Sequence, residues 1–234
     1  MSVTTICTII PTFNRPTLLA KALSSVWQAD QIIVVDDGST YDVRPLCANH
    51  GVRDIVSAPP MTPEERMTTP RQGRLLNQAL ELVRCDVVTY LCDDDLHAPG
   101  WYSALRQEWA ANPERLLVRG NWLVFQDGDT PEFDNPPCPM DPARGMTAGN
   151  FAHHASLTRD RGARWDERRF NCLDSEFLHA LHAAGADQFR AYHLGCVAGW
   201  RREHPLTNSN YSDGQRHTPA FLDVLRGGLL EVAR

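Results

Sequence analysis

Apolar residues in the first half of the chain form short runs that alternate with stretches of helical spacing. The runs predict buried strands, the first of them stopped by Pro11, and the spaced stretches predict helices. The predicted strands are residues 4–10, 31–37, 52–58 and 86–92, and the predicted helices are residues 15–28, 43–51 and 71–85. The proline- and threonine-rich segment 59–70 is interpreted as a loop. This alternation predicts an α/β fold, with a mostly parallel sheet flanked by helices.

The pattern becomes less regular after Trp101. We predict helices at residues 101–113, 171–186 and 217–234, and strands at 115–125, 150–160 and 189–204. Asn171 is the expected N-cap of its helix. Residues 126–146 are rich in Pro, Gly and Asp, and we predict a long loop or lid there. The second half is therefore expected to form a smaller region of different architecture.

Composition is consistent with one large folded domain. Of the 234 residues, 42% are hydrophobic, which allows a substantial core. The net charge of −6 argues against a long basic groove for nucleic acid. Arginine carries nearly all of the positive charge, since Lys21 is the single lysine. Arginine is suited to bidentate contacts with phosphate or carboxylate.

The seven cysteines are scattered and form no C-x-x-C pair. This usage is typical of reduced thiols and favours a cytoplasmic protein. The first residues lack the basic start and long apolar core of a signal peptide. No run approaches the roughly 20 apolar residues that span a bilayer. We therefore expect no transmembrane segment.

Polar motifs follow three of the predicted strands. "PTFNRP" starts at Pro11, "DDGS" at Asp36, and "DDD" covers Asp93, Asp94 and Asp95. In open parallel sheets, ligands bind beyond the carboxyl ends of the strands. Parallel packing would bring these three separated motifs to one edge, which is the strongest functional signal in the spacing.

Three consecutive aspartates repel one another unless a positive group lies nearby. Clustered carboxylates favour a hard divalent cation such as Mg²⁺ or Mn²⁺, which binds one or two carboxylates together with substrate phosphates. The alternative is a solvated acidic turn that stabilises the N-terminus of the next helix. Both interpretations stay open on this motif alone.

Two stretches carry a family resemblance. "TTICTIIPTFNRPTLLAKALSSVWQADQIIVVDDGS" and "LLNQALELVRCDVVTYLCDDDLHAPGW" resemble the donor-binding half of GT-A-fold inverting glycosyltransferases of family two, and the second is similar to the spore-coat polysaccharide type. The resemblance implies a Rossmann-like sheet, with residues 1–110 as the nucleotide-sugar-binding half. Residues 111–234 would form the acceptor-binding and catalytic-base half of the same domain. The donor nucleotide would contact Pro11, Thr12, Asn14, Arg15, Asp36 or Asp37, Arg71 and Asp93.

The metal residues are also implied by the resemblance. Asp94 and Asp95 would hold Mn²⁺ or Mg²⁺, and His204 would complete the site, with Arg201 or Arg202 on phosphate. Many family members have aspartate at the position of Cys92. This departure leaves the division of roles among the three aspartates open.

The predicted catalytic base is Asp174, in "CLDSEF", with Glu176 as the second candidate. The alternative role of Asp174 is to stabilise a helix N-terminus, three residues after Asn171. His153 and His154 could face the acceptor, but one core and one exposed histidine is the favoured interpretation.

The implied reaction is inverting transfer of a sugar from a nucleotide-diphosphate donor, with UDP favoured by family frequency. The acceptor class stays open among a glycan, a small molecule, a protein and a modified nucleobase. Two other functions are weighed against it. A nucleotidyltransferase would normally use a Gly-rich or Lys-bearing phosphate loop, for which one lysine offers little, and a non-catalytic sugar-nucleotide-binding module would not need Asp174.

Overall fold

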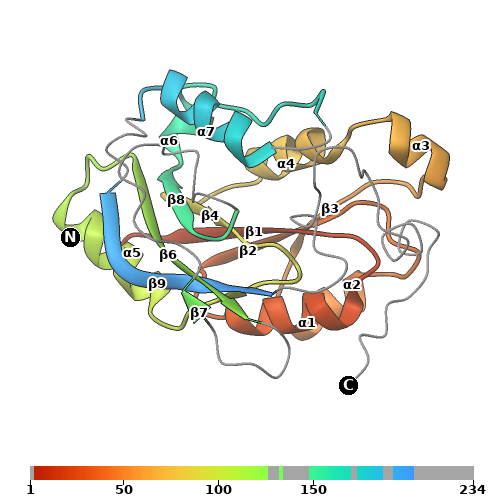
Figure 1. The fold of residues 1–234 in the computed structure, drawn as a ribbon, viewed down its shortest axis with the longest axis horizontal. Helices are drawn as coiled ribbons and strands as arrows, with labels where there is room; N and C mark the ends of the chain where they lie inside the picture. Colours follow the sequence, from red (N-terminus) through yellow and green to blue (C-terminus); the bar gives the residue numbers. More distant parts are fainter. Residues whose placement is uncertain (1–2, 126–131, 134–147, 170–172, 187–191, 203–234) are drawn as a thin grey trace.

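The computed structural model describes residues 3–125, 132–133, 148–169, 173–186 and 192–202 (Figure 1). The predicted helix 217–234, most of the predicted loop 126–146, Asn171 and His204 lie outside these ranges.

A single sheet runs through the described part of the chain, in the order β3-β2-β1-β4-β8-β6-β9-β5, with β7 paired to β6. Its strands are β1 Ile6–Thr12, β2 Gln31–Asp36, β3 Asp54–Ser57, β4 Val87–Tyr90, β5 Leu96–His97, β6 Leu117–Phe125, β7 Glu132–Phe133, β8 Phe151–His154 and β9 Tyr192–Arg202. The strands β3, β2, β1 and β4 pair in parallel, whereas β8 is antiparallel to both of its neighbours. Strands from both halves of the sequence thus share one sheet.

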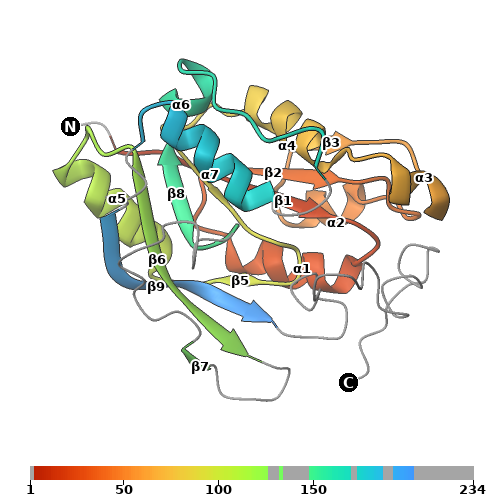
Figure 2. The ribbon, with the colours of Figure 1, turned by 45° about the horizontal axis from the view of Figure 1, so that its top comes forward.

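Helices cover both faces of this sheet (Figures 1 and 2). One layer contains α3 Pro63–Thr68, α4 Gln72–Glu81, α6 Ser156–Arg159 and α7 Leu173–Ala183, and the other contains α1 Pro16–Ser25, α2 Arg44–Asn49 and α5 Trp101–Ala111. The mostly parallel sheet flanked by helices is therefore confirmed.

Each face has its own apolar core. On the α4–α7 face, Tyr90 and Phe177 are almost fully buried, and Phe177 stacks on Trp165 with ring centroids 4.1 Å apart. On the opposite face, Trp101 and Leu105 of α5 pack with Leu19 of α1. The site-bearing ends of the strands therefore rest on rigid, buried elements.

Three local predictions differ from the structure. Strand β1 continues through Pro11 to Thr12, because β4 pairs only with Ile6–Ile9 and leaves this end of β1 with one neighbouring strand, where proline is tolerated. The predicted loop 59–70 contains α3, whose capping box joins Thr62 and Glu65. The predicted strand 150–160 is β8 followed by α6.

The approach of α4 to the loop before α7 depends on a glycine. A Cβ on Gly73 would lie 2.3 Å from the Asp166 carbonyl oxygen. We expect Gly73→Ala to lower the free energy of unfolding by about 1–3 kcal/mol through overpacking. Gly100→Ala, where a Cβ meets nothing within 4 Å, is the control and is expected to change it by less than about 0.5 kcal/mol. Urea denaturation of both variants measures the difference, and equal stabilities would contradict the packing argument.

Candidate active site

The three aspartates form a tight turn directly after β4. The Asp95 N–H donates to the Cys92 carbonyl oxygen over 3.1 Å, and each aspartate is less than 10% exposed. Arg15 donates to Asp93 over 3.0 Å and to Asp94 over 2.9 Å, and the Thr12 hydroxyl donates to Asp93 over 2.8 Å. The end of β1 and the end of β4 therefore meet, as the sequence predicted. Among the described residues, the Arg15 guanidinium is a positive group beside Asp93 and Asp94.

Opposing effects act on the pKa of Asp93 in this turn. Burial raises the pKa of Asp93, and the charge of Asp94 raises it further, while Arg15 and Thr12 act in the opposite direction. Arg15 is the group that makes two adjacent carboxylates tolerable in a buried position. A divalent cation would do the same.

Donor atoms suitable for a metal come together in the same turn. One ligand atom from each of Cys92, Asp94 and Asp95 can be chosen so that all three lie within 4.8 Å of one another. Burial, followed by the neighbouring aspartates, raises the pKa of the Cys92 thiol, so its protonated form is favoured. A protonated thiol is a poor ligand, whereas carboxylates suit Mn²⁺ or Mg²⁺. The chemistry of Asp94 and Asp95 therefore fits the cation that the sequence predicted.

The loop after β2 packs against the loop after β1. Asn14 has a left-handed backbone (φ 52°), and its side-chain oxygen accepts the Thr40 N–H over 2.7 Å. The Ser39 hydroxyl accepts the Asn14 N–H over 2.9 Å. Asp36 in turn accepts the Ser39 N–H over 3.0 Å, and burial raises its pKa. Asn14 thus joins the two loops through its hydrogen bonds to Ser39 and Thr40, and Asp36 is hydrogen-bonded to the same Ser39.

Asp37 has a different environment from Asp36. Its carboxylate accepts from Arg66 over 2.7 Å and from Arg71, and both arginines also donate to its backbone carbonyl. Arg71 further donates to the Pro59 carbonyl over 2.7 Å. The side chains of the two arginines are 7% and 4% exposed. Asp37 and Arg71 therefore hold the loop in place, whereas the Asp36 carboxylate has no arginine hydrogen-bond or ion-pair partner among the interactions of the described residues.

Arg66 is a site-supporting residue that the sequence reasoning missed. It lies on α3, with its guanidinium carbon 3.5 Å from the centre of the Phe13 ring. The segment was interpreted as a loop because of its prolines. The capping-box pattern Thr62-Pro-Glu-Glu65 was the available signal for a helix there.

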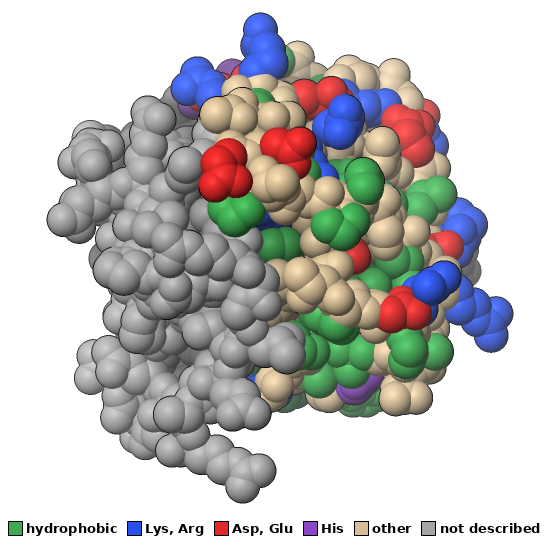
Figure 3. Space-filling view, turned by 90° about the vertical axis from the view of Figure 1, so that its right-hand side faces the viewer, with side chains coloured by type: hydrophobic (Ala, Val, Ile, Leu, Met, Phe, Trp, Pro, Cys, Tyr) green, Lys and Arg blue, Asp and Glu red, His purple; other side chains and the backbone are tan. Residues whose placement is uncertain are grey.

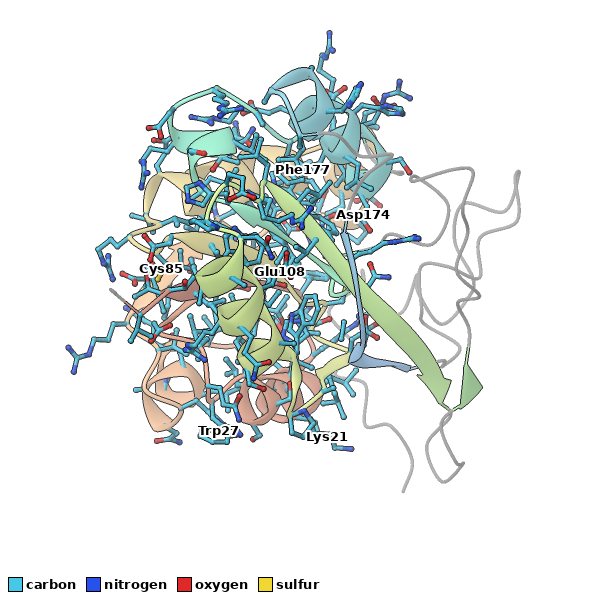
Figure 4. All side chains as sticks on the ribbon, turned by 90° about the vertical axis from the view of Figure 1, so that its left-hand side faces the viewer. Lys21, Trp27, Cys85, Glu108, Asp174 and Phe177 are labelled. Carbon is cyan, nitrogen blue, oxygen red and sulfur yellow. The ribbon has the colours of Figure 1, made fainter. Side chains whose placement is uncertain are left out.

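Asp174 lies in the first turn of α7, over the sheet (Figure 4). Its carboxylate accepts the Ala148 N–H over 3.0 Å, and burial raises its pKa. The charge of Asp174 also contributes, after burial and the charges of Asp95 and Asp94, to the raised pKa of Cys92. Asp174 is thus the α7 carboxylate that lies toward the candidate metal site.

Glu176 occupies another side of α7. It pairs with Arg169 over 3.3 Å and lines an open depression of about 600 Å³ together with Arg164, Asp166 and His179. This position is separate from the aspartate turn, and it makes Glu176 the weaker candidate for a base.

The remaining candidate residues have mixed outcomes. His153 is fully buried and bonds the Tyr90 hydroxyl over 3.0 Å, whereas His154 is half-buried, close to the favoured interpretation of one core histidine and one exposed. His204 lies outside the described residues. Arg201 and Arg202 belong to β9.

The surface agrees with the charge argument. In Figure 3, acidic, basic and apolar side chains are interspersed over the described part of one face, with no continuous basic stripe there. Among the described residues, no helix is long and apolar enough to cross a membrane.

The chain belongs to glycosyl transferase family 2. The sequence profile described as "Glycosyl transferase family 2" matches residues 7–133, which is more than half of the chain and includes β1 to β7. This confirms the family resemblance drawn from the strand-end motifs.

Two curated relatives are similar to this chain over part of their length. "Protein CgeD" of Bacillus subtilis is 29% identical over 161 residues, which are 66% of this chain and 34% of CgeD. The "GalNAc(5)-diNAcBac-PP-undecaprenol beta-1,3-glucosyltransferase" of Campylobacter jejuni is 33% identical over 125 residues, which are 52% of this chain and 39% of that protein. The match thus spans less than half the length of each relative.

A solved structure shares the fold. Glucosyl-3-phosphoglycerate synthase from Mycobacterium tuberculosis, in complex with Mn²⁺, UDP-glucose and phosphoglyceric acid, has a TM-score of 0.59 and 16% identity. The likeness covers 98% of this chain and 82% of that chain. The predicted GT-A class is confirmed by this likeness.

Proposed function

We propose that this protein transfers a sugar from a nucleotide-diphosphate donor, UDP being favoured, to an acceptor hydroxyl with inversion at the anomeric carbon. The observation that carries the proposal is the meeting of three strand-end motifs at one edge of the sheet, where the charge of Asp174 also acts on Cys92 of the aspartate turn. The motifs alone are common turns, but their convergence within electrostatic reach of the Asp174 carboxylate suits donor binding and proton removal in one place.

Separate residues contact the base and the ribose of the donor. Asp36 accepts hydrogen bonds from the base, and Asp93 does so from the ribose. Residues Pro11 to Arg15 border the nucleotide. Arg71 acts through Asp37, because its donors already hold that residue and Pro59. The donor half is thus residues 1–110, and the acceptor half is residues 111–234.

Asp94 and Asp95 are the proposed ligands of Mn²⁺ or Mg²⁺, with His204 as a further candidate. A cation bound there supplies a Lewis acid that neutralises the charge developing on the departing diphosphate. Arg15 donates to Asp94 Oδ2 in the structure, and because a carboxylate has two oxygens, a cation could share Asp94 with Arg15. The Arg15 guanidinium would also suit bidentate contact with a phosphate.

Asp174 is the proposed general base. The acceptor oxygen attacks the anomeric carbon from the face opposite the diphosphate, and Asp174 takes the hydroxyl proton. The bond from the anomeric carbon to the diphosphate oxygen breaks, and its electron pair leaves with the nucleoside diphosphate. The raised pKa of Asp174 suits a base, because it makes the carboxylate a better proton acceptor than an exposed one.

The acceptor class and the cellular location are also proposals. The acceptor is a glycan, a small molecule, a protein or a modified nucleobase. A cytoplasmic location fits the cysteine usage.

Ligand-dependent stabilisation is the test. We expect one nucleotide class among UDP-, GDP-, dTDP- and CMP-sugars to raise the melting temperature in the presence of Mn²⁺, and EDTA to abolish the shift. A ligand at 100 times its Kd adds about 2.7 kcal/mol to the stability of the folded state. Thermal-shift measurements on the folded protein report it. No shift with any donor would contradict the donor-binding proposal.

Product analysis separates the alternatives. From a nucleotide-diphosphate sugar, glycosyl transfer releases a nucleoside diphosphate, whereas nucleotidyl transfer releases a sugar 1-phosphate. A shift without either product, over a panel of acceptors, indicates a non-catalytic binding module. The anomeric configuration of the product, measured by NMR, tests inversion.

A further inference from the structure

A buried chain of hydrogen bonds runs from Thr8 of β1 through Tyr102 and His97 to the Gly149 carbonyl oxygen, in the segment whose Ala148 N–H donates to Asp174. Its central residue is His97, which is two residues after Asp95 and 2% exposed. One ring nitrogen, Nδ1, lies 2.8 Å from the Tyr102 hydroxyl, and the other, Nε2, lies 3.2 Å from the Gly149 carbonyl oxygen. The Tyr102 hydroxyl is itself 2.8 Å from the Thr8 hydroxyl.

The direction of these bonds follows from the acceptor at one end. A carbonyl oxygen can only accept, so Nε2 carries the hydrogen and donates to Gly149. The neutral ring then accepts at Nδ1 from Tyr102, and Thr8 donates to Tyr102. The chain therefore starts on β1, the strand that carries the donor motif, and has one defined order of donors.

The other end of the chain is the strap Ala148–Gly149–Asn150. Gly149 has a φ of +114°, which a residue with a side chain rarely adopts. This backbone lets the Gly149 carbonyl face His97 while the Ala148 N–H faces the Asp174 carboxylate. The Asn150 carbonyl accepts the Gly120 N–H over 2.8 Å, which joins the strap to β6.

We propose that His97 is the positioning residue that sets the catalytic base relative to the donor site. His97 joins the aspartate turn to the strap, and the strap holds Asp174 through the Ala148 N–H. The inference rests on the proposed function, in which Asp174 is the base. A displacement of about 1 Å in such a group can lower a rate by about 100-fold.

The test compares His97→Asn with His97→Gln. The Gln amide reaches the position of Nε2 and keeps the donor to Gly149, whereas the shorter Asn amide reaches only the position of Nδ1, near Tyr102. Each variant loses one buried hydrogen bond, so similar losses of melting temperature are expected. The two variants therefore differ in whether they keep the hydrogen bond to the Gly149 carbonyl oxygen.

Amide hydrogen exchange provides a readout that does not depend on activity. We expect the Ala148 amide to exchange at least about 10-fold faster in His97→Asn than in the wild type, with His97→Gln near the wild type. Asp174→Ala, which removes the acceptor, is the reference for a lost bond. Equal Ala148 exchange in the wild type and both His97 variants would overturn the inference.

Kinetics provide the second readout. We expect kcat to fall by roughly 10- to 100-fold in His97→Asn, with the donor KM within about 2-fold, and His97→Gln to retain most of the activity. An active wild type and an equally active His97→Asn would overturn the role of His97. A wild type that transfers no sugar contradicts the proposed function instead, and the exchange rates still test whether His97 holds the strap.

Discussion

Asp174→Asn is expected to lower kcat for sugar transfer by about 10²- to 10⁴-fold, the usual contribution of general acid–base catalysis. The amide cannot take the acceptor proton, but its oxygen can still accept the Ala148 N–H. Donor binding should therefore stay close to that of the wild type. Steady-state kinetics with the preferred donor, together with thermal-shift titration, separate the two effects.

Stability supplies an internal control for this variant. Burial raises the pKa of Asp174 above its unfolded value of about 3.9, so the ionised carboxylate opposes folding once the pH exceeds that value. At neutral pH, Asp174→Asn should be at least as stable as the wild type. In the wild type, the acid limb of kcat/KM should lie above pH 4. Glu176→Gln, on another side of α7, is expected to keep near-normal turnover, and the reverse result would transfer the role of base to Glu176.

Asp94→Asn is expected to abolish the metal-dependent part of donor binding. One of the two proposed carboxylate ligands is lost. Since even a residue that only hydrogen-bonds to a ligand can be worth 10- to 100-fold in metal affinity, we expect a loss of at least about 100-fold. Titration of Mn²⁺ against the thermal shift produced by the donor measures this.

The matched control for Asp94→Asn is Asp42→Asn. Asp42 is exposed, pairs with Arg44 and has no contact with the aspartate turn among the interactions described here. This change should leave the Mn²⁺ titration unaltered. If Asp94→Asn keeps full metal-dependent transfer, the metal assignment is wrong, and the Arg15–Asp94 pair is a structural ion pair.

The ion pairs of Arg15 with Asp93 and Asp94 have a proposed role in the catalytic cycle. Without a cation, Arg15 makes the buried carboxylates tolerable. We propose that, with a cation bound, the same arginine would contact a phosphate of the donor. One side chain would then stabilise the turn before the donor arrives and contact the donor afterwards.

Features of this site that depend on local sequence could be predicted, whereas features that depend on contacts between distant segments could not. The choice between Asp36 and Asp37 stayed open because both follow the same strand. The proposal of Asp36 rests on Arg66 and Arg71, which are 29 and 34 positions from Asp37 and pair with it only in the folded chain. The strap at Ala148 could not be predicted from the sequence either, since its hydrogen bonds to His97 and Asp174 join three separate segments.

The sequence by itself determined the fold class, the family and the motifs that meet at one edge of the sheet. Hydrophobic periodicity is local, and the carboxyl ends of parallel strands must coincide, so the meeting of "PTFNRP" with "DDD" followed from topology. Only the tertiary structure decided which charges pair: Arg15 with Asp93 and Asp94, and the two arginines with Asp37. The physical reason is that an ion pair depends on a few ångströms between side chains, a distance that spacing along the chain does not specify.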